Sequence, residues 1–518
     1  MARIFWNTAE KEVIQGLDIL GYRQIDQDVE KAWVAGITTV SNRARYLTLV
    51  PWLVAQYYDQ CGAGAGSPVR EPVYDELVQL HRRLELVVLA CTRHMDEATG
   101  RRTTGLIGPD IFSEEMQQLA NGLPVSLKLS KGGSSYRTYV TPARSFGLLA
   151  YDTLSGSWAP KLTPRTRGLC ECRSVIAKDS KLADAIRRGG TLRRQMIEGE
   201  AHLFAATALT DARCEPERCF LERALFVPEA DQDTEQYRRF AATVKFALEF
   251  VGQGTTLSSQ IIARTFAKAI LESPSDLTET ELAWTTYELH RRVHFALELL
   301  LDSATQVAAE RNGATVDEII SQWASERLPQ GLSGVLRPKG FSWKSRLSAF
   351  ADMVCHDALF QGPIGRQVEW QNLKPGAKAA FALAVLVSSW VRSGSLRSSR
   401  HLQGEEAGMY RAFPILDRSQ DRRLIDVAVE VTSHCVVEAH LVSTLRKMSA
   451  GMKCSLRFYP DGRVLRPTGI GVMPGYSADR LDNVLGILGD LGFLDMPNGQ
   501  LTERGTKLLE RLEETNAR

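Results

Sequence analysis

The sequence predicts a mainly α-helical, multi-domain protein that carries small β-hairpins and a C-terminal winged-helix module. Apolar residues recur at helical spacing through most of the 518 residues, whereas alternating runs are short and few. The longest nearly apolar run, Ala379 to Val391, is too short to span a bilayer and therefore predicts a core helix. Hydrophobic content of 44% and charged content of 24% are ordinary for globular proteins, which excludes wholesale disorder.

Changes in composition divide the chain into five expected domains. The stretch from Cys61 to Pro72 is rich in Gly and Pro and ends a first helical unit. An acidic stretch from Cys214 to Asp233 is a candidate boundary between domains. We expect an N-terminal helical unit at 1–60, a basic domain of helices and a hairpin with a winged-helix-like element at 73–200, a helical domain at 201–335, a basic helical domain at 336–450, and the winged-helix module at 451–518.

The first unit is organised around a buried helix from Tyr46 to Tyr58. Apolar and aromatic residues occupy nearly every face of this segment, which is typical of a core helix. Arg43 and Arg45 precede it, and guanidinium groups beside so apolar a helix need carboxylate, phosphate or carbonyl partners. We interpret both arginines as structural or as contacts to a partner.

The run around these arginines also carries a resemblance. Thr38 to Trp52 reads T-T-x-S-N-R-A-R-Y-L-x-L-x-P-W, and G-L-D-I-L-G precedes it at Gly16 to Gly21. This part of the chain, about the first 60 residues, resembles the N-terminus of large helical proteins of bacterial anti-phage defence clusters. The resemblance implies a cytoplasmic bacterial setting and a place in a multi-protein assembly, and it brings no catalytic residue with it.

Most of the remaining chain shows helical periodicity. A Lys-Gly-Gly turn between alternating runs predicts a hairpin within Val125–Thr141, although its second half also fits a helix. A second hairpin is expected at Leu456–Pro467, around Asp461-Gly462, where it would open the C-terminal module. The expected helices are Val73–His94, one beginning at Ser113, Gln236–Gly252, Ser258–Leu271, Thr278–Arg311, Val316–Leu328, Lys344–Phe360, Gly376–Arg392 and Asp421–Met448.

One pattern occurs twice, at Phe146–Leu169 and at Leu491–Leu512. In each copy a glycine and an apolar pair are followed by a polar turn, then by Leu-Thr-x-Arg and a helical pattern. Physically this is a helix that ends at a C′ glycine, a short hairpin, and a Thr-capped second helix. Such an order predicts a winged helix, and the C-terminal copy, with Pro497-Asn498-Gly499 at the wing tip, fits it better.

Positive charge gathers in two stretches although the whole chain is nearly neutral. Residues 120–200 hold fourteen Lys and Arg against six Asp and Glu, and residues 336–400 hold ten against three. Clustered cations release counterions from a phosphate backbone and so predict sequence-independent nucleic-acid binding. The alternative is that these cations are solvated or paired with the acidic segment Glu215–Glu235. The candidate contacts are Lys161, Arg165, Arg167, Arg173, Arg187, Arg188, Arg193 and Arg194.

The helix of the C-terminal module that would read DNA carries Asp479, Asp482 and Asp490 against Arg480. Three carboxylates near phosphate would weaken binding, so we expect this module, with Arg480, to be structural or to contact a protein.

Metal or cofactor chemistry has few candidates. His434, Glu438 and His440 lack the spacing of a two-His helical zinc motif, and His356-Asp357 stands alone. Nine scattered cysteines, among them Cys170, Cys172, Cys214 and Cys219, predict reduced thiols in a cytosol and not a zinc site.

We therefore expect no cofactor, no metal and no membrane partner. The leading hypothesis is a non-enzymatic cytoplasmic subunit of a DNA-directed bacterial assembly, in anti-phage defence, which contacts nucleic-acid backbone and other proteins. One alternative is a metal-dependent nuclease or hydrolase built around His356, Asp357, His434 and His440. Another is a pure protein–protein scaffold.

Overall fold

A computed structural model describes residues 18–61, 73–150, 160–230, 232–271, 276–328, 341–355, 357–364, 369–397, 411–449 and 451–516. The protein is mainly helical, as predicted, and its described strands are short. It divides into two compact units, each built from segments far apart in sequence. Unit 1 comprises Met1–Val29 and Ser259–Ala478, and unit 2 comprises Glu30–Ser258 and Asp479–Arg518. This division differs from the five consecutive domains expected from the sequence, because each unit includes a terminal segment of the chain.

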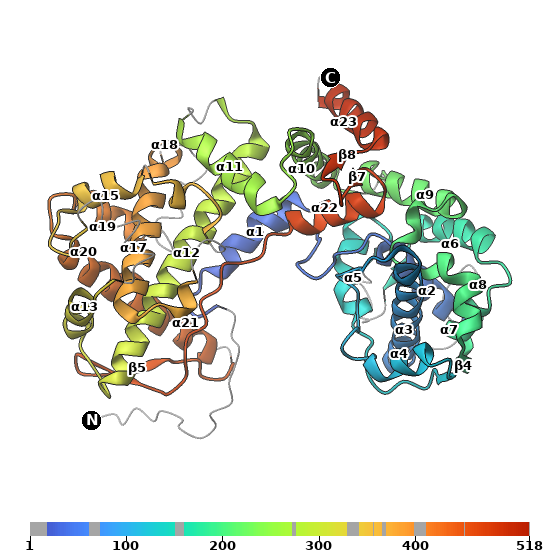
Figure 1. Cartoon of the computed structure of the whole chain (residues 1–518), viewed down its shortest axis with the longest axis horizontal. Helices are drawn as coiled ribbons and strands as arrows, with labels where there is room; N and C mark the ends of the chain where they lie inside the picture. Colours follow the sequence, from blue (N-terminus) through green and yellow to red (C-terminus); the bar gives the residue numbers. More distant parts are fainter. Residues whose placement is uncertain are drawn as a thin grey trace. The chain divides into compact units, whose positions relative to one another are not determined.

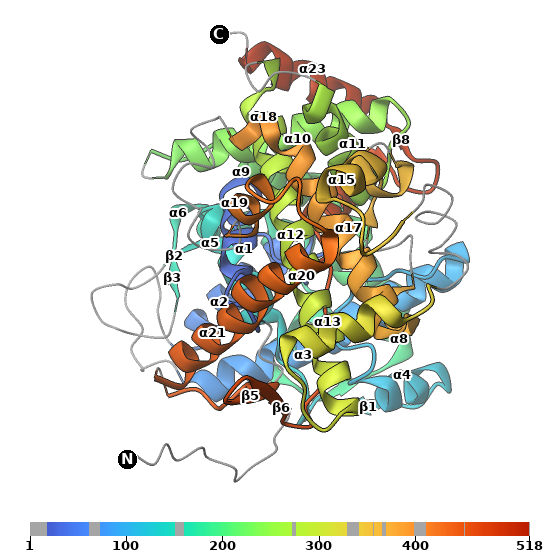
Figure 2. The ribbon, with the colours of Figure 1, turned by 90° about the vertical axis from the view of Figure 1, so that its left-hand side faces the viewer.

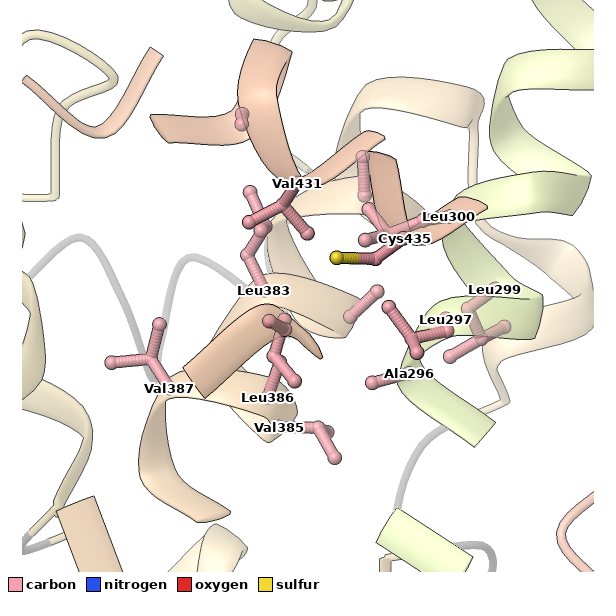
Figure 3. Packing of buried hydrophobic residues seen from close by; sticks show 14 of the residues in the cluster. Ala296, Leu297, Leu299, Leu300, Leu383, Val385, Leu386, Val387, Val431 and Cys435 are labelled. Atoms are coloured by element: carbon pink, nitrogen blue, oxygen red, sulfur yellow. The ribbon is translucent and has the colours of Figure 1, made fainter. Parts of the chain in front are cut away.

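Unit 1 is built around two helices, α12 (Glu279–Glu310) and α17 (Pro375–Arg392), which run side by side (Figures 1 and 2). Leu297 and Leu300 of α12 meet Leu383 and Leu386 of α17 in a core of fully buried side chains (Figure 3). Thr278 and Glu281 form a reciprocal capping box that fixes the start of α12. The long apolar run predicted as a core helix is thus the helix α17, buried along almost its whole length.

Shorter helices surround this pair. The predicted helix Asp421–Met448 is interrupted: a π-helical segment, Thr432–Val437, lies between α20 and α21. The elements of unit 1 are α11 (Ser258–Leu271, whose first residue belongs to unit 2), α13 (Val316–Ser325), α15 (Leu347–Cys355), the 3₁₀ turns Ala358–Phe360 and Trp370–Asn372, α18 (Gly394–Arg397), α19 (Ala412–Asp417), α20 (Leu424–Val431), α21 (Glu438–Ser449), β5 (Phe458–Asp461) and β6 (Val464–Pro467); α1 (Arg23–Trp33) spans the division between the units.

The hairpin predicted around Asp461-Gly462 exists as the antiparallel pair β5–β6, with Asp461 opposite Val464. It belongs to unit 1, where Leu465 forms a β-bridge with Ala314. The expectation that this hairpin opens the C-terminal module is therefore wrong, since the chain passes from unit 1 to unit 2 between Ala478 and Asp479.

Unit 2 contains the helix predicted at Tyr46–Tyr58, observed as the buried α2 (Tyr46–Gln60), which packs against α3, α5 and α6 (Figure 1). Its other elements are α3 (Tyr74–Thr99), α4 (Ser113–Ala120), β1 (Val125–Ser126), α5 (Ser135–Ser145), β2 (Leu149–Ala150), β3 (Lys161–Leu162), α6 (Pro164–Ile176), α7 (Lys181–Arg188), β4 (Thr191–Leu192), α8 (Arg194–Phe204), the 3₁₀ turns Ala208–Thr210 and Ala212–Cys214, α9 (Glu215–Phe226), α10 (Thr234–Gly252), α22 (Leu481–Asp490), β7 (Leu494–Asp495), β8 (Gln500–Leu501) and α23 (Glu503–Asn516).

The hairpin predicted within Val125–Thr141 does not form. β1 pairs with β4, far along the chain, and the residues after the Lys-Gly-Gly turn fold into α5, the helical alternative. The carboxylate of Glu85 accepts hydrogen bonds from the backbone N–H of Gly133 at 2.7 Å and of Ser135 at 2.5 Å. These bonds hold the start of α5, and Tyr136, Tyr139 and Ala143 are then buried at helical spacing.

The repeated pattern is structurally equivalent in its two copies, both in unit 2. β2 pairs with β3 in the same register as β7 with β8, so that Leu149 faces Leu162 and Leu494 faces Leu501. The Thr163 hydroxyl donates to the carbonyl of Gly147 at 2.8 Å, and the Thr502 hydroxyl donates to that of Gly492 at 2.7 Å. Both glycines have positive φ, at 64° and 78°, as C′ glycines require. The unit therefore holds two copies of one helix–hairpin–helix motif.

Candidate nucleic-acid interface

Two of the eight predicted phosphate contacts are buried structural arginines. Arg173 is completely buried; it pairs with Glu217 at 2.7 Å and lies over the rings of Trp52 and Phe204. Arg45 binds the other oxygen of Glu217 at 2.9 Å and is equally buried. The prediction that Arg173 contacts nucleic acid is therefore wrong, because its charge is neutralised inside the core.

Arg165 is the second buried arginine among the predicted phosphate contacts. Its guanidinium donates to the carbonyls of Phe146, Ala224 and Val227 and pairs with Glu229 at 3.1 Å. Only 7% of the residue is exposed, so it cannot meet a phosphate. Glu217 and Glu229 both belong to the acidic segment Glu215–Glu235. For Arg165 and Arg173, the structure therefore agrees with the alternative prediction, in which these cations pair with the acidic segment.

Four other predicted contacts, Arg187, Arg188, Arg193 and Arg194, lie at or next to a two-stranded ribbon, β1–β4. Val125 lies opposite Leu192 and Ser126 opposite Thr191, and the N–H of Leu127 extends the pairing by donating to the carbonyl of Gly190 at 2.9 Å. Along the ribbon, the apolar side chains Val125, Leu127 and Leu192 are buried, whereas Ser126, Lys128, Thr191 and Arg193 are exposed. This alternation places the polar side chains on one face. Together with Arg188, exposed at the end of α7, we call Ser126, Lys128, Thr191 and Arg193 the ribbon surface.

Local geometry explains how the chain reaches this arrangement. Ser180 caps the start of α7, and Arg187 and Arg188 occupy its last turn, where the helix dipole favours positive charge. Gly189 and Gly190 then adopt φ values of 82° and 107°, which residues with a side chain rarely adopt, and turn the chain into β4. Arg83 of α3 holds this turn by donating to the carbonyls of Leu127, Ile186 and Arg187.

The four arginines around β4 differ in whether a carboxylate pairs with them. Arg187 pairs with Asp184 one helical turn before it, and Arg194 pairs with Glu198 at 3.0 Å. Among the described residues, Arg188 and Arg193 form no ion pair, although both are exposed. Exposed pairs of this kind are worth about 0.3–0.5 kcal/mol, so Arg187 and Arg194 can also exchange their carboxylates for phosphate.

A hollow of about 480 Å³ lies beside the ribbon. The carboxylate of Glu200 at its edge is already engaged, since it accepts from the Ser180 hydroxyl and from the backbone N–H of Lys181 and Leu182. No aromatic side chain lines the hollow, which is formed by Lys181, Thr191, Arg193, Gln195, Met196, Gly199 and Glu200.

Lys161 and Arg167 are exposed but lie on the β2–β3 hairpin and α6, not on the ribbon. The second basic stretch, 336–400, contributes less surface charge than its composition suggests. Lys378 is buried and paired with Asp302 at 2.5 Å. Arg392 is buried too and donates to the carbonyl of Cys355. These two burials correct the expectation that the whole stretch is a basic surface.

The remaining predicted arginines bind groups within unit 2. Arg43 pairs with Asp490 of α22 at 2.7 Å, and the N–H of Ala44 donates to the same carboxylate at 2.9 Å. Burial raises the pKa of Asp490 to about 6, although Arg43 opposes this. Arg480 pairs with Glu30 at 3.2 Å and donates to the carbonyl of Ile37.

The residues of the T-T-x-S-N-R-A-R run thus form the surface against which α22, the first helix of the C-terminal motif, packs. We call this surface the seat of α22. Asp479 and Asp490 are buried, and Asp482 lies within 3.5 Å of the Ser258 hydroxyl. Most of α22 is buried in unit 2, although Asp482 itself is exposed. The expectation that this module is structural or contacts a protein stays a prediction.

The groups considered for metal binding are dispersed or engaged. His434 bonds Glu438, whereas His440 bonds the carbonyl of Ile19 through Nδ1 and accepts from the N–H of Arg457 through Nε2. In the part of the chain that the structure describes, no three His, Cys, Asp or Glu side chains gather as a metal site would require. His356 lies outside the described residues.

Sequence reasoning missed Lys128, which belongs to the ribbon surface, and Arg83, which holds the turn before β4. The signal for Lys128 was the alternation V-S-L-K-L, which fits the exposed edge of a strand. No protein-family model, curated protein or solved structure matches the chain. None of its described helices combines the length and apolar character needed to cross a bilayer.

Proposed function

We propose that this protein is a non-enzymatic subunit of a cytoplasmic, DNA-directed bacterial assembly in anti-phage defence, and that unit 2 contacts nucleic-acid backbone through the ribbon surface. One observation carries the proposal: Arg188, which precedes β4, and Arg193, which follows it, are both exposed, and neither forms an ion pair among the described residues. Cations without intramolecular partners gain most from a polyanion, because binding releases condensed counterions at no cost in broken ion pairs.

The neighbouring arginines add to this surface. Arg187 and Arg194 flank the ribbon with weak, exposed pairs, and the hydroxyls of Ser126 and Thr191 can donate to phosphate oxygens. Lys161 of β3 and Arg167 of α6 are proposed as further contacts. The buried seat of α22 supports no nucleic-acid role for that helix, so the C-terminal motif, which has the element order of a winged helix, is proposed as structural or as a contact to a partner protein.

Binding of the full-length protein to a labelled DNA duplex tests the proposal, measured by fluorescence anisotropy across a salt titration. We expect the double variant R188A/R193A to weaken binding and to reduce its salt dependence. The matched control is R223A/R238A, which removes two exposed arginines from α9 and α10 and leaves the ribbon intact. Absence of binding at low salt, or equal binding by both variants, rejects the proposal and leaves a helical scaffold.

A further inference from the structure

We infer that the ribbon surface takes double-stranded nucleic acid by its phosphate backbones, and not a single strand held through its bases. The inference rests on the proposed function and names the class of ligand at the same site. It follows from three features of unit 2: where its aromatic side chains lie, how the cations are divided between two strands, and what the side chains between them can donate.

Proteins that hold single strands without sequence preference stack the bases on exposed aromatic side chains. The described part of unit 2 offers no such platform, since none of its aromatic residues is among the exposed large apolar side chains. The aromatics nearest the ribbon in sequence are used internally. Tyr139 is completely buried and stacks on Tyr46, and Tyr136, at 7% exposed, packs on His81.

The cations flank both strands of the ribbon. Lys128 follows β1, whereas Arg188 and Arg193 flank β4, and the backbone bond between Leu127 and Gly190 ties the two sides together. A two-stranded ribbon has a width that the major groove of duplex DNA admits. Cations on both of its sides can then meet the phosphates on both sides of a groove, whereas one strand of nucleic acid would leave one side unmatched.

Hydroxyl groups fill the space between the cations. Ser126 and Thr191 lie opposite each other in the register, and both side chains are exposed. Hydroxyls of this kind donate to phosphate oxygens or base edges, and they provide no face on which a base could stack. The hollow beside the ribbon has the same character, because none of its lining residues is aromatic.

The number of phosphate contacts predicts how steeply binding weakens with salt. If Lys128, Arg188, Arg193 and Arg194 each neutralise one phosphate, the slope of log K against log salt is about −3.6 for a duplex and about −2.8 for a single strand. Duplex affinity then falls about 100-fold between 50 and 200 mM salt. The double variant R188A/R193A retains two contacts, so its affinity falls only about 10-fold over the same range.

The test uses the full-length protein and one labelled oligonucleotide, offered alone and after annealing to its complement. We expect the duplex to bind at least tenfold more tightly at low salt. We also expect K128A to weaken duplex binding, because it removes the cation on the β1 side. All the changed side chains are exposed, and thermal unfolding of each variant checks that it folds.

The outcomes separate this inference from the function it rests on. Duplex preference that is lost in R188A/R193A, but kept in R223A/R238A, supports both. Equal or tighter binding of the single strand, with the same sensitivity to R188A/R193A, overturns the duplex inference while the proposed function stands. Failure of both nucleic acids to bind, or indifference to R188A/R193A, overturns the proposed function and this inference with it.

Discussion

Replacing Glu217 by Gln is expected to destabilise unit 2 more than any exposed substitution, because this carboxylate neutralises two buried arginines. Glu217 accepts from Arg173 at 2.7 Å, from Arg45 at 2.9 Å and from the Thr48 hydroxyl at 2.5 Å, and it has no exposed surface. Burial alone would raise its pKa, but the two arginines outweigh burial and hold the pKa at about 2, below the usual 4.5.

The difference between the folded and the usual pKa of Glu217 sets the expected loss of stability. A pKa lowered from 4.5 to about 2 on folding corresponds to about 3 kcal/mol of stability. Since the folded pKa is depressed, this stability is present above pH 4.5 and is lost as the pH falls toward 2. An amide cannot balance two guanidinium charges, so E217Q should cost about 3–5 kcal/mol at neutral pH.

Hydrogen exchange of the amides in α2, α6 and α9 measures this loss within unit 2. We expect E217Q to speed their exchange about 100-fold or more. The control E198Q removes an exposed carboxylate paired with Arg194 and should change exchange less than about threefold. If E217Q does not accumulate, T48V removes one donor to the same carboxylate and should cost about 1 kcal/mol. Exchange in E217Q no faster than in E198Q would refute the reasoning.

Two further substitutions test the packing of each unit. In unit 1, burial lowers the pKa of His440 to about 4 from 6.5, so stability falls as the pH drops below 6.5, by about 1.4 kcal/mol at pH 5.5. The variant H440Q should lose this dependence in urea unfolding at pH 7 and 5.5, and equal losses in variant and parent would contradict the assignment. In unit 2, D490A removes the acceptor of the Ala44 N–H and the carboxylate that pairs with Arg43, which then keeps only the Thr104 carbonyl, and should cost about 2–4 kcal/mol. Protection of α22 in hydrogen exchange reports it, and unchanged protection would show that the seat of α22 does not depend on this carboxylate.

Local patterns predicted most helices and both helix–hairpin–helix motifs, because the information for them lies within a few residues. Capping by Thr278, the buried run of α17 and the glycines Gly147 and Gly492 act at short range, and each is visible in the sequence. The false hairpin at Val125–Thr141 shows the limit of such patterns. Its outcome depended on Glu85, which lies on α3 and binds the N–H groups of Gly133 and Ser135.

The sequence predicted the basic region and eight candidate contacts, of which four lie at or next to the ribbon and two are buried. Sequence counts every arginine equally, whereas the fold buried Arg165 and Arg173 against Glu229 and Glu217 and left Arg188 and Arg193 exposed. Lys128 joined the surface only because β1 pairs with a strand more than sixty residues away.

By itself, then, the sequence determined the helical class, the repeated motif and the local excess of positive charge, since each depends on composition or short-range periodicity. The tertiary structure alone decided the two discontinuous units, the seat of α22 on residues 37–45, and which cations meet solvent. The physical reason is the same in each case. A buried charge must find a partner, and that partner can lie anywhere along the chain.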